Sequence, residues 1–289
     1  MNSIAIGIFD GVHAGHQSIL REAASHGPLT VLTFDPHPTS VFAPERTPTS
    51  LISLADRVEL LKSYGAVNVV VREFTKEFAA LSPDEFISQI LRDELHASHI
   101  TVGANFTFGH KAAGNVDYLK AHAGVPVSAV ALAENRGSAI SSSRIRTLVI
   151  DGDVERANEL LTRNFYIKGP VVHGEKRGRE IGYPTANIGL AESATIPADG
   201  VYAGWLEVAG QRWQAAISIG TNPTFPGVRG RQVEAYALDQ TGLDLYDHEA
   251  RLEFGFRLRD TLKFDGLDPL LEQMAKDCDL ARVLTANAH

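Results

Sequence analysis

The chain has almost no cysteine: Cys278 is the only one among 289 residues. A single cysteine can form neither an internal disulfide nor a zinc site built on cysteine pairs, which excludes disulfide-rich scaffolds and zinc fingers. The chain also lacks an apolar run long enough to span a bilayer, and its N-terminus, MNSIAIGIFDG, lacks the basic start and long apolar core of a signal peptide. We therefore expect a cytoplasmic protein with no membrane partner.

Positive charge is also scarce, with 27 Lys and Arg residues against 35 Asp and Glu residues and a net charge of −8. The first 150 residues carry a net charge of −2 and the remainder −6. Proteins that bind the backbone of DNA or RNA usually carry a basic excess, so we predict no nucleic-acid partner. A hydrophobic fraction of 44% is typical of a packed globular protein, and the length suits two domains.

The first half alternates short apolar segments with segments of helical periodicity. Ser3–Phe9 and Leu29–Phe34 read as buried strands and Val67–Val71 as a third strand, and HITVG and VPVSAVAL add two more. HQSILREAASHG and SLADRVELLKSYG read as helices, and SPDEFISQILRDEL begins with the capping box Ser82–Glu85. This alternation predicts a Rossmann-like parallel sheet covered on both faces, with ligands bound beyond the carboxyl ends of its strands.

The pattern changes after about residue 165, where short strand-like pieces are broken by glycine and proline. They predict an antiparallel β-barrel, and LDPLLEQMAKDCDLARVLTANA predicts a terminal amphipathic helix. The expected organisation is a first domain over residues 1–150, a connecting helix over 151–164 and a second domain over 165–289.

The stretch GIFDGVHAGH lies where the first predicted strand ends and the first helix begins. Such a junction offers free backbone N–H groups to a phosphate, and Gly7 and Gly11 remove side chains where a nucleotide must come close. His13 and His16 are three residues apart, so they share one face of the opening turn and can donate hydrogen bonds to phosphoryl oxygens. The pattern favours attack by a phosphate on the α-phosphorus of a nucleoside triphosphate. The alternatives are a tight turn with two surface histidines, or a two-histidine metal site, for which no third ligand is evident nearby.

The second half has phosphate chemistry of its own. Thr185 and Asn187 in PTAN are two residues apart, so in an extended segment both face the same way and can help to hold the Mg²⁺ carried by ATP. Glu234 lies among apolar residues of a predicted strand, so it must face either solvent or a site. Considered alone, the basic stretch HGEKRGRE and Glu234 would be a solvated hairpin and an exposed strand residue.

Taken together, GIFDGVHAGH, TFDPHP, VGANFTFG, ISSSRIR and PTAN resemble the motifs of bacterial FAD synthetases, the bifunctional riboflavin kinase/FMN adenylyltransferases. Ser143 stands where that family usually has threonine, and it keeps the hydroxyl. The resemblance implies that His13 and His16 serve adenylyl transfer and that Glu234 is the base that takes the proton of the ribityl 5′-hydroxyl. It also implies an ATP site for adenylyl transfer at Gly7, Phe9, Asp10, Gly11, His13, His16, Ser142, Ser143 and Arg146, a flavin site at Phe34, Asp35, Asn105, Phe106 and Phe108, an ATP site for the kinase at Gly174, Lys176, Arg177, Gly178, Arg179 and Pro184, and Mg²⁺ ligands at Thr185 and Asn187.

The resemblance therefore predicts an enzyme that phosphorylates riboflavin to FMN with ATP and then adenylylates FMN to FAD and pyrophosphate, with Mg²⁺ as cofactor. Two alternatives stay open. One is an adenylyl- or cytidylyltransferase for another phosphorylated substrate with an inactive kinase-like module. The other is a non-catalytic flavin-binding protein. Small molecules are the expected partners, and self-association is left open.

Overall fold

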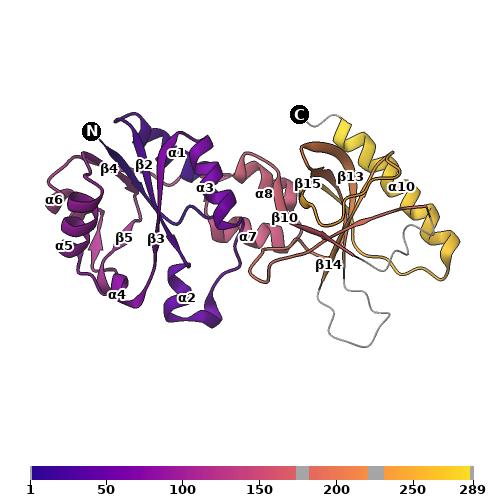
Figure 1. Cartoon of the computed structure of the whole chain (residues 1–289), viewed down its shortest axis with the longest axis horizontal. Helices are drawn as coiled ribbons and strands as arrows, with labels where there is room; N and C mark the ends of the chain where they lie inside the picture. Colours follow the sequence, from indigo (N-terminus) through magenta and orange to yellow (C-terminus); the bar gives the residue numbers. More distant parts are fainter. Residues whose placement is uncertain (1, 174–181, 221–230, 287–289) are drawn as a thin grey trace. The chain divides into compact units, whose positions relative to one another are not determined.

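The computed structural model describes residues 2–173, 182–220 and 231–286. The chain divides into two compact units, Met1–Ser142 and Ser143–His289, and each is described by itself (Figure 1). The division falls eight residues before the boundary expected at residue 150, inside a helix, α7 (Ser142–Ile150).

The first unit contains a five-stranded parallel sheet, as predicted. Its strand order is β3-β2-β1-β4-β7, with β1 (Ser3–Ile6) in the centre. Each residue of β1 is buried, because a central strand is covered on both faces. The connections run from β1 toward one edge and then cross to the other side, so the point of reversal lies beside β1. In open sheets ligands bind at such a point, beyond the carboxyl ends of the strands. The other strands are β2 (Leu29–Asp35), β3 (Ala66–Glu73), β4 (His99–Gly103) and β7 (Val127–Val130).

Helices cover both faces of this sheet, with α1 and α3 on one side of the strands and α5 and α6 on the other (Figure 1). The capping box at Ser82 is present, since Ser82 accepts from the N–H of Glu85 and the Glu85 side chain accepts from the N–H of Ser82. The helix then continues as a π-helix, which the sequence pattern does not distinguish from an α-helix because either form gathers its apolar residues on one buried side. The helical segments are α1 (Ala14–Ala24), α2 (Pro38–Phe42), η1 (Pro44–Arg46), α3 (Leu54–Ser63), α4 (Lys76–Ala79), α5 (Pro83–Glu85), the π-helix η2 (Phe86–Glu94), η3 (His110–Ala112) and α6 (Val116–His122). Two small antiparallel ribbons pair β5 (Thr107–Phe108) with β6 (Gly114–Asn115) and β8 (Glu134–Asn135) with β9 (Ser138–Ala139).

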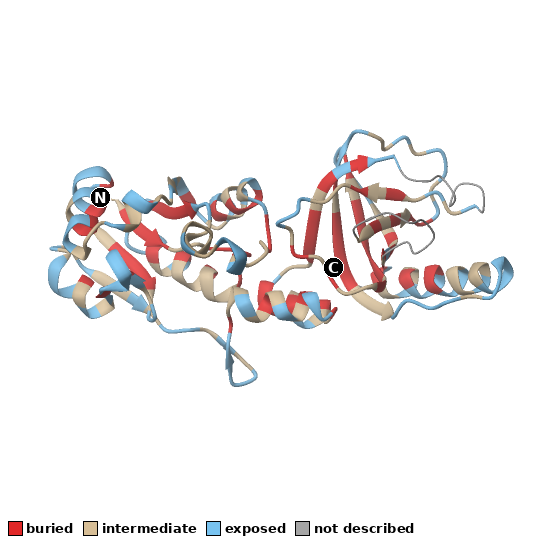
Figure 2. Cartoon of the chain, turned by 90° about the horizontal axis from the view of Figure 1, so that it is seen from below, coloured by how far each residue is buried: buried red, intermediate tan, exposed pale blue. Residues whose placement is uncertain are grey.

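The second unit is a closed barrel in the order β10-β11-β14-β13-β12-β15, and each of its recorded strand pairs is antiparallel. Phe165, Tyr202 and Phe254 are among its fully buried side chains, and Figure 2 shows buried residues along its strands. Gly204 allows the close approach of β12 and β15, because a Cβ at this position would lie 1.8 Å from the carbonyl oxygen of Glu253. The elements are α8 (Val154–Leu161), β10 (Phe165–Val172), β11 (Ala186–Ile188), β12 (Gly200–Val208), β13 (Gln211–Gly220), β14 (Gln232–Ala237), β15 (Glu249–Arg259) and α10 (Leu267–Ala286).

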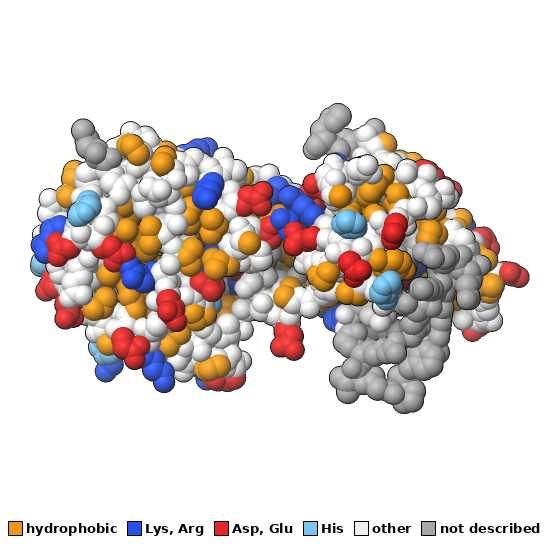
Figure 3. Space-filling view, in the orientation of Figure 1, with side chains coloured by type: hydrophobic (Ala, Val, Ile, Leu, Met, Phe, Trp, Pro, Cys, Tyr) orange, Lys and Arg blue, Asp and Glu red, His pale blue; other side chains and the backbone are white. Residues whose placement is uncertain are grey.

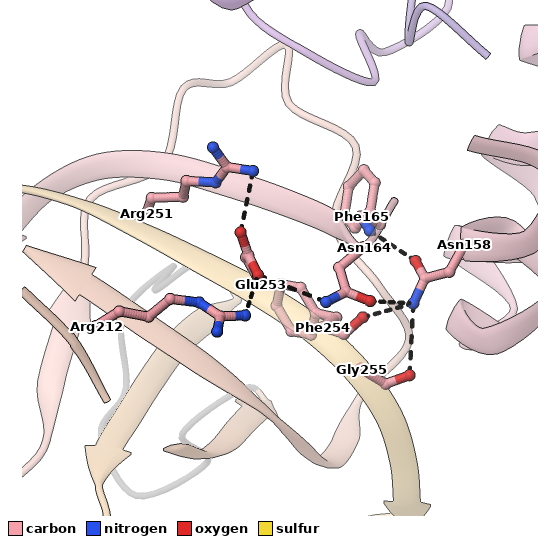
Figure 4. Close-up of polar contacts among 8 residues, drawn as sticks. All are labelled: Asn158, Asn164, Phe165, Arg212, Arg251, Glu253, Phe254 and Gly255. Carbon is pink, nitrogen blue, oxygen red and sulfur yellow. Dashed lines mark hydrogen bonds and ion pairs between the residues drawn. The ribbon is translucent and has the colours of Figure 1, made fainter. Parts of the chain in front are cut away.

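Asn158 attaches α8 to the barrel through its side-chain amide (Figure 4). Its oxygen accepts from the N–H of Phe165 at 2.6 Å, and its nitrogen donates to the carbonyl of Phe254 at 2.9 Å. Beside it, Glu253 pairs with Arg212 at 2.9 Å and with Arg251 at 3.0 Å (Figure 4). The start of β10 and the middle of β15 are thereby held to the same helix.

Candidate functional sites

The loop between β1 and α1 has an unusual backbone. Gly11 adopts a φ of +80°, and the non-glycine residues Phe9 and Val12 adopt φ values of +54° and +40°. A β-branched residue such as Val12 rarely adopts positive φ, and backbone strain of this kind is concentrated at functional sites. The Phe9 side chain is buried and packs edge-on against His16, so only the backbone of Phe9 is suited to contact a nucleotide.

His13 and His16 lie together at the start of α1, as their spacing predicted. Their rings stack with centroids 3.6 Å apart, and His13 caps the helix by accepting at Nδ1 from the backbone N–H of His16 at 3.3 Å. Because that bond uses the lone pair of Nδ1, the proton of a neutral His13 must be on Nε2, which makes His13 a donor there. Gly15 leaves room for this ring, since a Cβ there would lie 3.2 Å from His13 Cε1, a tight contact.

Burial, with the neighbouring His13 adding to it, lowers the pKa of His16 well below its ordinary value. His16 is therefore a neutral imidazole at pH 7, and its Nδ1 has no hydrogen-bond partner among the described residues. A neutral imidazole at the start of a helix can donate a hydrogen bond to a phosphoryl oxygen without needing to be charged.

Asp10 joins two of the predicted motifs. Its carboxylate accepts from the N–H of Leu51 at 3.0 Å, and its carbonyl oxygen accepts from the hydroxyl of Ser142 at 2.8 Å. The start of ISSSRIR is thus held against the β1–α1 loop. Ser143 and Arg146 follow on α7 and are counted with the second unit; Ser143 is exposed and Arg146 is half-buried.

An aromatic cavity of about 710 Å³ opens at the carboxyl ends of the strands. Phe34, Phe106 and Phe108 line it, and the rings of Phe106 and Phe108 stack with centroids 5.6 Å apart. Gly7 and Ile8 also line it, so the cavity borders the loop that leads to the histidines. Asp35 and Asn105, predicted with this group, are exposed and do not line it.

Four further phenylalanines line the cavity and were not predicted. Phe74 illustrates the missed signal, because it directly follows β3, whereas Phe42 is the last residue of α2. Figure 3 shows hydrophobic side chains at the surface over the region of α2 and β3, where Phe42 and Val67 are exposed. The unpredicted lining residues are Phe42, Phe74, Phe78 and Phe86.

The barrel brings three of the predicted kinase residues together, Thr185, Asn187 and Glu234. Glu234 on β14 is paired in register with Asn187 on β11. The Thr185 hydroxyl lies 3.5 Å from Oε2 of Glu234. Thr185 and Glu234 line a pocket of about 300 Å³ together with Ser218 and Arg259, which the sequence did not single out. Pro184 and Thr185 line a second pocket of about 590 Å³.

Gly174, Lys176, Arg177, Gly178 and Arg179 lie outside the described residues.

The donor set at Glu234 fits a magnesium ion that arrives with a nucleotide. Within residues 2–173, 182–220 and 231–286, no cluster of three or more His, Cys, Asp or Glu side chains is arranged to hold a metal. Mg²⁺ usually keeps several waters and binds through few protein oxygens plus substrate phosphates. The hydroxyl of Thr185 and the amide oxygen of Asn187, beside one carboxylate, are oxygen ligands of this kind.

Comparison with known proteins gives the same two halves. Residues 1–144 match the family model of FAD synthetase, and residues 161–285 match that of riboflavin kinase. The chain is 39% identical over 286 residues to the bifunctional riboflavin kinase/FMN adenylyltransferase of Bacillus subtilis, covering 95% of this chain and 89% of that protein. It is 34% identical to the enzyme of the same name from Escherichia coli K12, covering 95% of this chain and 90% of that one.

A solved structure from Streptococcus pneumoniae is also similar over nearly the whole length. It is called a macrolide-efflux protein, and it matches with a TM-score of 0.89 and 34% identity, covering 97% of this chain and 94% of that one. In the part of this chain that the structure describes, no helix has the length and apolar character needed to cross a bilayer.

Proposed function

The chain belongs to the family of bifunctional riboflavin kinase/FMN adenylyltransferases, and from this premise we propose how its residues divide the two reactions. The enzyme makes FMN from riboflavin and ATP, and FAD and pyrophosphate from FMN and a second ATP. Adenylyl transfer belongs to the β1–α1 loop and the aromatic cavity of the first unit, and phosphorylation belongs to the Thr185–Asn187–Glu234 group of the barrel.

In adenylyl transfer, a phosphate oxygen of FMN attacks the α-phosphorus of ATP, and the bond to the pyrophosphate breaks. No covalent nucleophile is needed. His13, through Nε2–H, and His16 donate to phosphoryl oxygens on which negative charge develops, while the flavin ring occupies the cavity lined by Phe34 and Phe106. Ser142 positions the loop by its bond to Asp10.

In the kinase reaction, Glu234 takes the proton of the ribityl 5′-hydroxyl as that oxygen attacks the γ-phosphorus of ATP, and ADP leaves. Thr185 and Asn187 hold the magnesium-bound triphosphate beside the base. When bound, Mg²⁺ shields the charge of the phosphate oxygens. The rest of the catalysis is positioning by the barrel.

The observation that carries the proposal is the position of the His13–His16 pair. It lies at the end of the loop whose Gly7 and Ile8 line the aromatic cavity, so that phosphate donors and a site for a flavin ring are neighbours. In the barrel, the Thr185 hydroxyl lies 3.5 Å from Glu234 Oε2, so a proposed magnesium ligand and the proposed base are neighbours.

Two substitutions test the division. His16→Ala is expected to abolish FAD formation from FMN and leave FMN formation from riboflavin intact, and Glu234→Gln is expected to do the reverse. Products formed with ATP and Mg²⁺ are separated by chromatography. The matched controls are His122→Ala and Glu207→Gln, which change exposed or half-buried residues outside both sites and should leave both activities near the parental rates. Loss of both activities in one folded variant would contradict separate sites.

A further inference from the structure

Arg57 is a buried arginine on α3 that none of the sequence motifs includes, with only 7% of its surface exposed. Its guanidinium reaches two strands of the sheet: Nη1 donates to the carbonyl of Ile8 at 2.9 Å, and Nη2 donates to the carbonyl of Phe34 at 3.1 Å. Ile8 follows β1, and Phe34 is the second-last residue of β2. One side chain therefore ties together the carboxyl ends of two neighbouring parallel strands.

Acidic groups keep this guanidinium in place. Its Nη2 lies 3.5 Å from a carboxylate oxygen of Asp35. Burial lowers the pKa of Arg57, and the carboxylates of Asp10 and Asp35 act against that effect. An arginine keeps its charge even when buried, because its ordinary pKa is above 12. The positive charge of Arg57 thus interacts with two carboxylates. Asp35 lies at the end of β2, and Asp10 lies in the loop that leads to the histidines.

The two carbonyls that Arg57 binds belong to the two parts of the candidate site. Phe34 is a wall of the aromatic cavity, and Ile8 lines the same cavity where the β1–α1 loop begins. The carbonyl of Ile8 also accepts from the hydroxyl of Thr33 at 3.0 Å. Beyond the last backbone bond between β1 and β2, from the N–H of Gly7 to the carbonyl of Leu32, this fork and the Thr33 hydroxyl link the flavin wall to the phosphate loop.

We propose that Arg57 is a positioning residue for adenylyl transfer, which holds the cavity wall and the β1–α1 loop at the separation that attack of the FMN phosphate on the α-phosphorus requires. This inference rests on the function proposed above for the first unit. Arg57 contacts neither substrate and acts only through Ile8 and Phe34. Its effect is on the rate of the transfer step, because displacing bound reactants by about 1 Å can reduce a rate about 100-fold.

Lysine cannot replace this fork. An ammonium group is a compact charge on a flexible stem, so Arg57→Lys keeps the charge beside Asp10 and Asp35 but loses the planar pair of donors to two carbonyls. Arg57→Met removes the charge as well. The two variants therefore separate the need for a buried cation from the need for the fork.

The test compares full-length Arg57→Lys and Arg57→Met with the parental enzyme and with Arg92→Lys, a control at an exposed arginine paired with Asp93. The kcat and KM of FMN adenylylation are measured per flavin-binding site, and riboflavin kinase activity in the same preparation reports on the other unit. We expect Arg57→Lys to lower kcat about 10- to 100-fold, with KM for ATP and FMN within about threefold of the parental values and kinase activity unchanged.

Two results would overturn the inference: a parental kcat per binding site in Arg57→Lys, or a raised KM at an unchanged kcat, which would mean that Arg57 only supports binding. If Arg57→Met does not fold, the lysine variant still decides the question. Failure of the proposed function would appear differently, as absence of FMN adenylylation in the parental enzyme or its persistence in His16→Ala.

Discussion

The ion pair between Asp277 on α10 and Arg259 at the end of β15 is expected to contribute strongly to the stability of the barrel unit. The carboxylate of Asp277 accepts from Arg259 Nε at 3.0 Å and Nη2 at 2.6 Å, and also from the side-chain amide of Gln273 at 2.9 Å. The Asp277 side chain is 8% exposed and that of Arg259 is 19% exposed. Asp277→Leu would leave the guanidinium without a carboxylate in a mostly buried setting.

The size of the effect follows from that burial. Removing one partner of a buried pair costs about 3–5 kcal/mol, because the remaining charge is uncompensated. Arg259 is one-fifth exposed and keeps a bond to the carbonyl of Asp260 at 3.0 Å, so the lower end, about 3 kcal/mol, applies. For a unit of this size, roughly 2–4 °C of Tm per kcal/mol gives a fall of roughly 6–12 °C.

Scanning calorimetry of the full chain measures this, and only the unfolding transition of the second unit should move. The double variant Asp277→Leu/Arg259→Met removes both charges, and its Tm should return to within about 3 °C of the parental value, since an apolar pair often replaces a buried ion pair without loss. Asp279→Leu, which breaks an exposed pair with Arg282 on the same helix, is the control and should cost at most about 1 kcal/mol. A double variant as unstable as Asp277→Leu would refute the reasoning.

Three further predictions concern single positions. Because burial lowers the pKa of His16 in the folded chain, the unfolded chain binds more protons than the folded chain below about pH 6.5. The free energy of unfolding should therefore decrease as the pH is lowered, by up to about 1.4 kcal/mol per pH unit, and His16→Gln should flatten that slope in urea unfolding. Gly204→Ala would place a Cβ 1.8 Å from the carbonyl oxygen of Glu253, so it should abolish riboflavin phosphorylation while FMN adenylylation continues. Gly210→Ala, where a Cβ meets nothing within 4 Å but φ is +78°, should cost only about 1–2 kcal/mol by thermal unfolding and leave both activities in place. Phe106→Ala should weaken FMN binding about tenfold in a fluorescence titration, because it removes one aromatic wall of the cavity.

Much of the fold could be predicted because its signals are local. The apolar runs of β1 to β4 are continuous in the sequence, and the capping box at Ser82 needs only four residues. Thr185 and Asn187 could be placed on one face from their spacing alone, and their approach to Glu234 followed once β11 paired with β14. The stacking of His13 on His16 is likewise a property of one helical turn.

The unpredicted parts of the site depend on contacts between distant segments. Nothing in the sequence around Arg57 indicates that its guanidinium reaches the carbonyls of Ile8 and Phe34 rather than water. Phe74 and Phe78 look like ordinary core residues, because phenylalanine is usually buried, and only the meeting of strand ends makes them a cavity wall. Asp35 was predicted from its motif, and its ion pair with Arg57 could not be predicted from the motif.

The closure of the barrel has a consequence for synthesis on the ribosome. β10 is the first strand of the barrel to emerge, but its long partner is β15, the last. At about 5–20 residues per second, β10 waits on the order of ten seconds for that partner, with Phe165 and its neighbours uncovered. The first unit has all its strands by then, so a nascent chain passes through an interval in which the first unit can fold and the second is prone to aggregate. We expect chaperones to bind during that interval.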